Sequence, residues 1–253
     1  MSNVRGGRLR HPGGQAIGVV LATLGLLAAT AVTSPAPGRA DTSYPVLLVH
    51  GGAGNPGNFK EMERRLVADG YRPFTVNLGF PGVDTARNAD MIRTEVDKIL
   101  ATTGASKVHL VGHSMGGLST RYYIKILNGL PQVATYTAFG TPQHGNPRHT
   151  CRPSELVPDQ CPRGKVMKEL NAGDDTPGSI YYTSIASKQA HPEEANGTWH
   201  PLDQGACLPM IDGGSHPEEP SNLAIYQAVR DGLNSTCPTG WTNLPEGWTN
   251  LPS

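Results

Sequence analysis

The sequence has no excess of charge of either sign, because 21 lysine and arginine residues balance 21 aspartate and glutamate residues. Proteins that bind nucleic acid carry clustered basic residues, so this balance does not predict a nucleic-acid partner. The four cysteines include no C-x-x-C pair, and the carboxylates show no EF-hand spacing. Those patterns are the usual signs of structural zinc and of calcium loops. A zinc site is therefore less expected than disulfides, and whether calcium stabilises the loops stays open. The chemistry considered below needs no metal and no organic cofactor.

No twin-arginine pair precedes the apolar run at residues 16–32. A basic segment comes before this run, and Gly38 and Ala40 follow it with the spacing of a secretory cleavage site. We expect residues 1–40 to be a signal peptide for general secretion, removed after Ala40. The alternative is a membrane anchor, but the run is at the short end for crossing a bilayer. The protein is thus expected to be secreted, with no stable membrane anchor.

The cysteines lie in the part of the chain that would remain after cleavage. An even number of cysteines in an exported protein indicates disulfides, and four cysteines allow three pairings. The local pairing, Cys151 with Cys161 and Cys207 with Cys237, is favoured because each pair falls within one loop or one terminal region.

Strands and helices alternate between residues 44 and 234. Continuous apolar runs predict six strands, at 44–51, 71–79, 107–114, 133–142, 179–187 and 206–214. Helical patterns lie at 58–70, 84–104, 115–129 and 221–234. This order predicts an α/β fold, with an approximately six-stranded, mainly parallel sheet flanked by helices. Ligands of such sheets bind at the carboxyl ends of the strands.

Two segments are expected to lie outside this pattern. Residues 143–165 are polar and rich in proline, which predicts a long loop. Residues 239–253 contain two copies of GWTNLP, too few for a repeat domain, so a flexible tail is expected. The predicted catalytic domain is therefore 41–238. Gly104 is predicted to end the second helix and Ser221 to cap the last one.

The third strand ends at Gly112-His113-Ser114-Met115-Gly116, which fits the pattern G-x-S-x-G. When a strand turns into a helix within two residues, the serine is held in a strained conformation with its hydroxyl outward. Glycine two positions to either side removes side chains that would collide. A glycine-rich turn without chemistry is the alternative. The flanking strand and helix favour a nucleophile.

Two backbone amides are candidates for an oxyanion hole. The amide of Met115 starts the helix after the serine, and the glycine-rich loop after the first strand supplies the second donor, for which we choose Gly52. The candidate base is His216, which follows the last strand. The other eight histidines are placed less suitably. His11 lies in the signal segment, and three more lie at strand ends or in the turn at Ser114, namely His50, His109 and His113. The remaining four lie in loops, where a solvated imidazole is expected: His144, His149, His191 and His200.

These residues resemble a known family. The segments VLLVHGG…NF, VHLVGHSMGG, YYIKILNG and YYTSIAS…LDQGA match, in order, the small secreted lipases of the α/β-hydrolase superfamily, of the minimal Bacillus type and from actinobacteria. The resemblance implies a compact α/β-hydrolase with little or no lid. It also implies that Ser114, His216 and the amides of Gly52 and Met115 carry the reaction.

The acid of the triad does not carry over directly. In the family an aspartate lies about five residues after the isoleucine of Y-T-S-I. Here the residue five positions after Ile185 is Ala190, which has no carboxylate. A slightly longer loop would bring Glu193 to that place, with Glu194 beside it. Asp203 is an alternative, and a chain without a functional acid is another.

The resemblance further implies an ester or lipid substrate, which could be met at a lipid–water interface, and a monomeric enzyme. Two other interpretations stay open. The altered acid loop and the tryptophans of the tail would suit a binding protein that kept the fold and lost catalysis. An acyltransferase or a polyester hydrolase would use the same serine.

Overall fold

The computed structural model describes residues 42–81, 83–147, 149, 151–152, 158–187, 202 and 205–237. All of them belong to one compact unit, Gly38–Ser253. The predicted signal peptide and the predicted tail lie outside the described residues. So do the candidate acids Glu193, Glu194 and Asp203.

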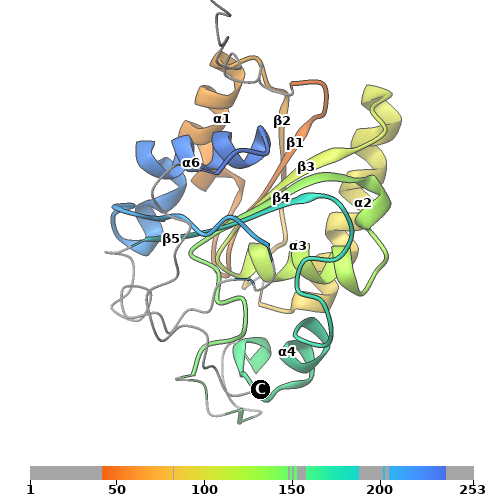
Figure 1. Ribbon diagram of the computed structural model, residues 1–253, viewed down its shortest axis with the longest axis vertical. Coiled ribbons are helices and arrows are strands. Elements are labelled where there is room, and N and C mark those ends of the chain that lie inside the picture. The colour runs from red at the N-terminus through yellow and green to blue at the C-terminus, as the bar shows by residue number, and fades with distance from the viewer. Residues whose placement is uncertain are drawn as a thin grey trace, which may run out of the picture. The chain divides into compact units, whose positions relative to one another are not determined.

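Six strands form the centre of the fold, in the order β2-β1-β3-β4-β5-β6, and every neighbouring pair is parallel (Figure 1). The strands are β1 (Val46–Val49), β2 (Pro73–Val76), β3 (Val108–His113), β4 (Val133–Phe139), β5 (Tyr181–Ser187) and β6 (Met210–Ile211). The predicted parallel sheet is confirmed, although β6 is much shorter than the apolar run suggests. Cys207, earlier in that run, makes only an isolated bridge to Thr183.

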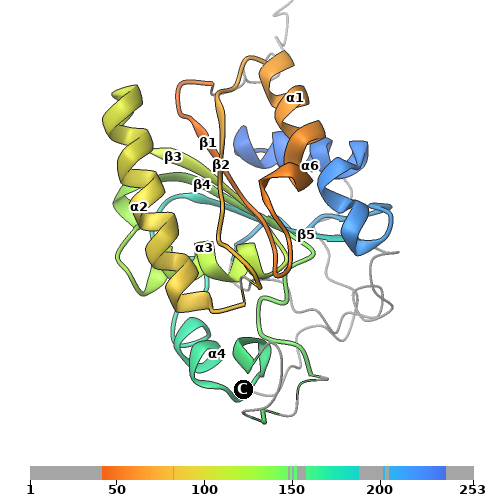
Figure 2. The ribbon, with the colours of Figure 1, turned by 180° about the vertical axis from the view of Figure 1, so that it is seen from behind.

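Helices cover both faces of the sheet (Figures 1 and 2). Alternate residues of β1 show the two layers. Leu47 and Val49 pack in the core with α2 (Thr85–Thr103), α3 (Met115–Lys125) and α4 (Lys165–Leu170). Val46 and Leu48 pack with α1 (Lys60–Ala68) and α6 (Leu223–Leu233). Since both faces are covered, β1 is apolar throughout rather than alternating.

The helix ends follow local chemistry, with one correction. Gly104 ends α2 in the left-handed conformation, with φ 69°, as the sequence predicts. The predicted cap Ser221 is wrong, because Asn222 caps α6 by accepting from the amides of Ala224 and Ile225. Ser221 instead ends a short 3-10 helix, η4 (His216–Ser221), and donates its hydroxyl to the Glu218 carbonyl.

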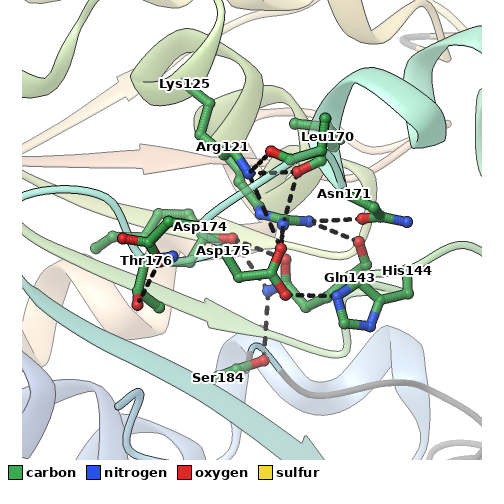
Figure 3. A network of polar contacts seen from close by, with 12 residues as sticks. Arg121, Lys125, Gln143, His144, Leu170, Asn171, Asp174, Asp175, Thr176 and Ser184 are labelled. Carbon is green, nitrogen blue, oxygen red and sulfur yellow. Dashed lines mark hydrogen bonds and ion pairs between the residues drawn. The ribbon is translucent and has the colours of Figure 1, made fainter. Parts of the chain in front are cut away.

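A buried ion pair anchors the segment that leaves β4 (Figure 3). Arg121 on α3 is fully buried and pairs with Asp175, which also lies 2.6 Å from Nε2 of His144. The guanidinium of Arg121 also donates to three oxygens, Gln143 O at 2.8 Å, Leu170 O at 2.9 Å and Asn171 Oδ1 at 3.3 Å. These contacts join α3 to both ends of the segment. His144 therefore hydrogen-bonds to a buried carboxylate, and the expectation of a solvated imidazole is wrong for it.

Both disulfides follow the local pairing, Cys151–Cys161 and Cys207–Cys237. The first lies within the predicted loop 143–165, where a short 3-10 helix, η3 (Pro158–Gln160), also occurs. The second ties the residues before β6 to the chain that follows α6. Among the helices of the described part of the chain, none combines the length and apolarity needed to cross a membrane.

Candidate active site

Ser114 occupies the turn between β3 and α3. Its backbone has φ 55° and ψ −128°, a conformation that residues other than glycine rarely adopt. Neighbouring groups hold it there, because the Ser114 amide donates to Phe139 O at 3.0 Å and Thr141 Oγ1 donates to Ser114 O at 2.9 Å. The strained turn expected from the sequence is present.

The glycines around Ser114 are required by close approach of the backbone. A Cβ on Gly112 would lie 2.6 Å from the Cα of Gly117, and one on Gly116 would lie 2.6 Å from the carbonyl oxygen of His50. A Cβ on Gly51 would lie 2.7 Å from that of Ser114 itself. The first two contacts give the steric reason for the G-x-S-x-G spacing, and the third packs the loop after β1 against the serine.

Ser114 faces a hollow of about 180 Å³ that it shares with His216. Residues 51–54 of the loop after β1 form another wall of the hollow, and Asn58, His113 and Pro217 complete the lining. The structure therefore brings together Ser114, His216 and Gly52, which lie far apart in the sequence. Met115 is buried directly after the serine, as the first residue of α3, where a backbone amide is not used within the helix.

His50 fixes the shape of the loop after β1. Its Nε2 accepts a hydrogen bond from the Leu78 amide at 3.0 Å, so its Nδ1 carries the proton and donates to Gly51 O at 2.8 Å. Burial lowers the pKa of His50 below its ordinary value. A neutral imidazole thus holds the glycine loop that borders Ser114.

Glu219 contacts His216, a neighbour that sequence reasoning missed. Both residues lie on η4, three positions apart, and Oε2 of Glu219 is 2.7 Å from Nδ1 of His216. The same oxygen is 3.0 Å from Nε2 of His113, the residue before Ser114. Glu219 is fully buried, and the rings of the two histidines are 4.6 Å apart between centroids.

The contacts of Glu219 determine its charge. Burial alone would raise the pKa of Glu219, but hydrogen bonding and attraction from His113 and His216 outweigh it, so the pKa lies below the ordinary value. Burial lowers the pKa of His113, although Glu219 opposes that effect. The arrangement at neutral pH is therefore a carboxylate that accepts from a neutral His113.

A sequence signal for Glu219 does exist. Ser215 and Glu218 form a capping box, in which Glu218 Oε2 accepts from the Ser215 amide at 3.0 Å. Such a box predicts a helical turn after Ser215, and residues three apart on a 3-10 helix lie on the same side. His216 and Glu219 are so placed. The expected chain order of serine, acid and histidine directed attention to the preceding loop instead.

His113, His216 and Glu219 also form a group whose ligand atoms lie within 4.8 Å of one another. A metal ion would require His113 Nε2 and His216 Nδ1 to be unprotonated. His113 Nε2 instead hydrogen-bonds to the Glu219 carboxylate at 3.0 Å, which favours a proton on that nitrogen, and His216 Nδ1 lies 2.7 Å from the same oxygen. The group thus suits proton transfer better than metal binding.

Comparison with known proteins agrees with this architecture. A family model described as alpha/beta hydrolase fold matches residues 44–148. A triacylglycerol lipase of Burkholderia plantarii is 37% identical over 147 residues, which are 52% of this chain and 40% of that protein. One of Pseudarthrobacter phenanthrenivorans is 38% identical over 115 residues, 42% of this chain and 35% of the relative. The chain therefore spans less than half of the length of these relatives.

Solved structures with the same fold include lipase B of Aspergillus fumigatus, with a TM-score of 0.64 and 18% identity over 84% of this chain and 57% of that one. The propeptide form of the Bacillus licheniformis lipase BlEst2 gives a TM-score of 0.63 and 18% identity, over 75% of this chain and 51% of that one. At such low identity these structures support the fold alone. With its parallel sheet, its strained serine turn and a family model that matches residues 44–148, the chain has the α/β-hydrolase fold.

Proposed function

We propose that this protein is a serine hydrolase that cleaves carboxylic esters through an acyl-enzyme on Ser114. The observation that carries the proposal is the strained Ser114, which faces a hollow shared with His216. The similarity to two triacylglycerol lipases supports an ester as the substrate. Fold alone would not support it, because α/β sheets of this kind serve many reactions.

In the proposed reaction, Oγ of Ser114 attacks the ester carbonyl carbon while His216 takes the hydroxyl proton. The amides of Met115 and Gly52 donate to the oxyanion that forms, and the N-terminus of α3 adds a favourable dipole. His216 then gives its proton to the leaving alcohol. Water attacks the acyl-enzyme by the same steps and releases the carboxylic acid.

The enzyme is proposed to act outside the cell. An ester or lipid substrate, met in solution or at a lipid–water interface, would be reached by a monomeric, secreted enzyme. Two disulfides support export, because such bonds persist in oxidising compartments. The basic and apolar residues before Ala40 support a signal peptide that is removed.

The test compares wild type with Ser114→Ala on p-nitrophenyl esters of several chain lengths. We expect wild type to hydrolyse them and Ser114→Ala to lose activity by at least about 10³-fold, since the nucleophile is gone. Thermal unfolding of both proteins controls for loss of the fold. Equal hydrolysis by the two would refute the mechanism. No hydrolysis by a folded wild type would favour the non-catalytic binding protein.

A further inference from the structure

We propose that Glu219 is the acid that positions His216 during catalysis, and that His113 positions Glu219. This inference rests on the proposed function, because it assigns a partner to the proposed base. It replaces the expectation that the acid lies in the loop after β5, at Glu193, Glu194 or Asp203. Neither Glu219 nor His113 makes or breaks a bond in this account, so both act through His216.

Glu219 lies beside one of the two ring nitrogens of His216. An imidazole has two nitrogens, and in a hydrolase of this type one faces the serine while the other faces the acid. Oε2 of Glu219 lies 2.7 Å from Nδ1, within ion-pair distance, although the two groups are not aligned as a hydrogen bond in this structure. Catalytic contacts of this kind are often poorly aligned before the substrate binds. Nε2 is the other ring nitrogen, and in the proposed reaction it takes the proton of Ser114. A second carboxylate at the same distance from Nδ1 would meet the charge of Glu219.

Burying the Glu219 carboxylate costs free energy of folding. Glu219 has no solvent exposure, and within the described residues its Oε1 has no hydrogen-bond partner. A buried carboxylate with an unsatisfied oxygen destabilises the folded state, and such groups concentrate where function requires them. The neighbouring Glu218 is exposed and only caps η4. The inward position of Glu219 is thus not explained by the capping of its own helix.

Residues of β3 and β4 pack around the contact between Glu219 and His216. His113 stacks on Phe139 of β4, with 5.0 Å between ring centroids, and this packing aims its Nε2 at the carboxylate. Gly140 follows at the end of β4 with φ 56°, and a Cβ there would lie 2.8 Å from His216 Nδ1. A side chain at position 140 would therefore fill the space in which acid and base meet. Three segments, from β3, β4 and η4, converge on one contact.

The main experiment measures kcat and KM of Glu219→Gln on p-nitrophenyl esters, with Glu218→Gln as the matched control. Glutamine keeps the size of the side chain and removes its charge. We expect kcat to fall by at least about 100-fold with KM nearly unchanged, since loss of the acid in the serine-protease template costs up to roughly 10⁴-fold. Glu218→Gln should remain close to wild type.

A pH profile separates positioning from a merely structural role. The buried carboxylate stabilises the imidazolium that forms when His216 takes the serine proton. Without it that positive charge has no partner, so the pH profile of kcat/KM in Glu219→Gln should change shape, which a merely structural loss would not cause. Should Glu219→Gln fail to fold, Glu219→Asp keeps the charge on a shorter stem and should retain the wild-type pH profile with reduced kcat.

His113 has its own pair of variants. His113→Asn leaves an amide that can donate to Glu219, whereas His113→Leu removes the donor. We expect His113→Leu to lose roughly tenfold or more in kcat, the size of one charge-assisted hydrogen bond, and His113→Asn to lose less. Equal kcat in the two variants would overturn the positioning role of His113.

The inference fails if kcat of folded Glu219→Gln stays within about 100-fold of wild type. It also fails if Glu193→Gln, Glu194→Gln or Asp203→Asn shows the larger loss. The proposed function is tested separately by labelling wild type with a fluorophosphonate. Labelled Ser114 together with an unimpaired Glu219→Gln would remove only the role of Glu219. An unlabelled Ser114 in folded wild type would remove the proposed function itself.

Discussion

Replacement of Arg121 by methionine should destabilise the protein by breaking a buried ion pair. Arg121 has no solvent exposure and Asp175 is nearly buried, so the variant leaves a carboxylate with little water around it. Removing one partner of a buried pair costs about 3 to 5 kcal/mol in general. His144 lies 2.6 Å and Lys125 Nζ 3.9 Å from the same carboxylate, which places the expected loss at the lower end, about 3 kcal/mol.

The measurement is equilibrium unfolding in urea with both disulfides intact, together with thermal unfolding. For a protein of this size, a loss of about 3 kcal/mol corresponds to a decrease in Tm of roughly 6–12 °C. The double variant Arg121→Met/Asp175→Asn is the control, because it removes both charges. It should lose less than the single variant, since no carboxylate is stranded.

Two results would refute this reasoning. A loss of less than about 1 kcal/mol in Arg121→Met would mean that the pair is effectively solvated. Additive losses in the double variant would mean that Asp175 does not depend on Arg121. Either result would also undermine the view that this pair anchors the segment after β4 to α3 (Figure 3).

Two further predictions concern stability. Burial lowers the pKa of His113, so below about pH 6.5 the unfolded chain binds a proton that the folded chain does not, and the free energy of unfolding should fall by at most about 1.4 kcal/mol per pH unit. Urea unfolding at a series of pH values should show a weaker dependence of this free energy on pH for His113→Asn than for wild type. An unchanged dependence would contradict the assignment. Replacement of Cys207 and Cys237 by serine opens a loop with a sequence separation of 30 and should lower the free energy of unfolding by about 3 to 4 kcal/mol; a calorimetric Tm equal to that of wild type would argue against this.

The fold was accessible from sequence because its signals are local. Apolar runs bounded by glycines specify the central strands, and the spacing of Ile92, Val96 and Ile99 specifies the buried face of α2. The end of the sheet was less accessible. The run at 206–214 is apolar enough for a strand, yet only Met210 and Ile211 pair with β5, because register depends on the partner strand.

The candidate site divides in the same way. The turn at Ser114 follows from its own five residues, and its geometry needs no distant partner to be recognised. The role of Glu219 is harder to predict, because Glu218 and Glu219 are the same residue type at consecutive positions. Which of them points inward depends on where η4 begins and on its packing against His113. The capping box of Ser215 and Glu218 indicates where η4 begins and puts Glu219 on the same side as His216, but the burial of that side is a tertiary property that the residue pattern does not contain.

The central claim is that Ser114 is an activated nucleophile. Its most direct test is mass spectrometry of the wild-type protein after treatment with a fluorophosphonate, which reacts readily only with an activated serine. The account predicts one adduct per chain, located on Ser114, together with loss of esterase activity. A folded protein that stays unlabelled at Ser114, or that keeps its esterase activity once Ser114 is labelled, would contradict it.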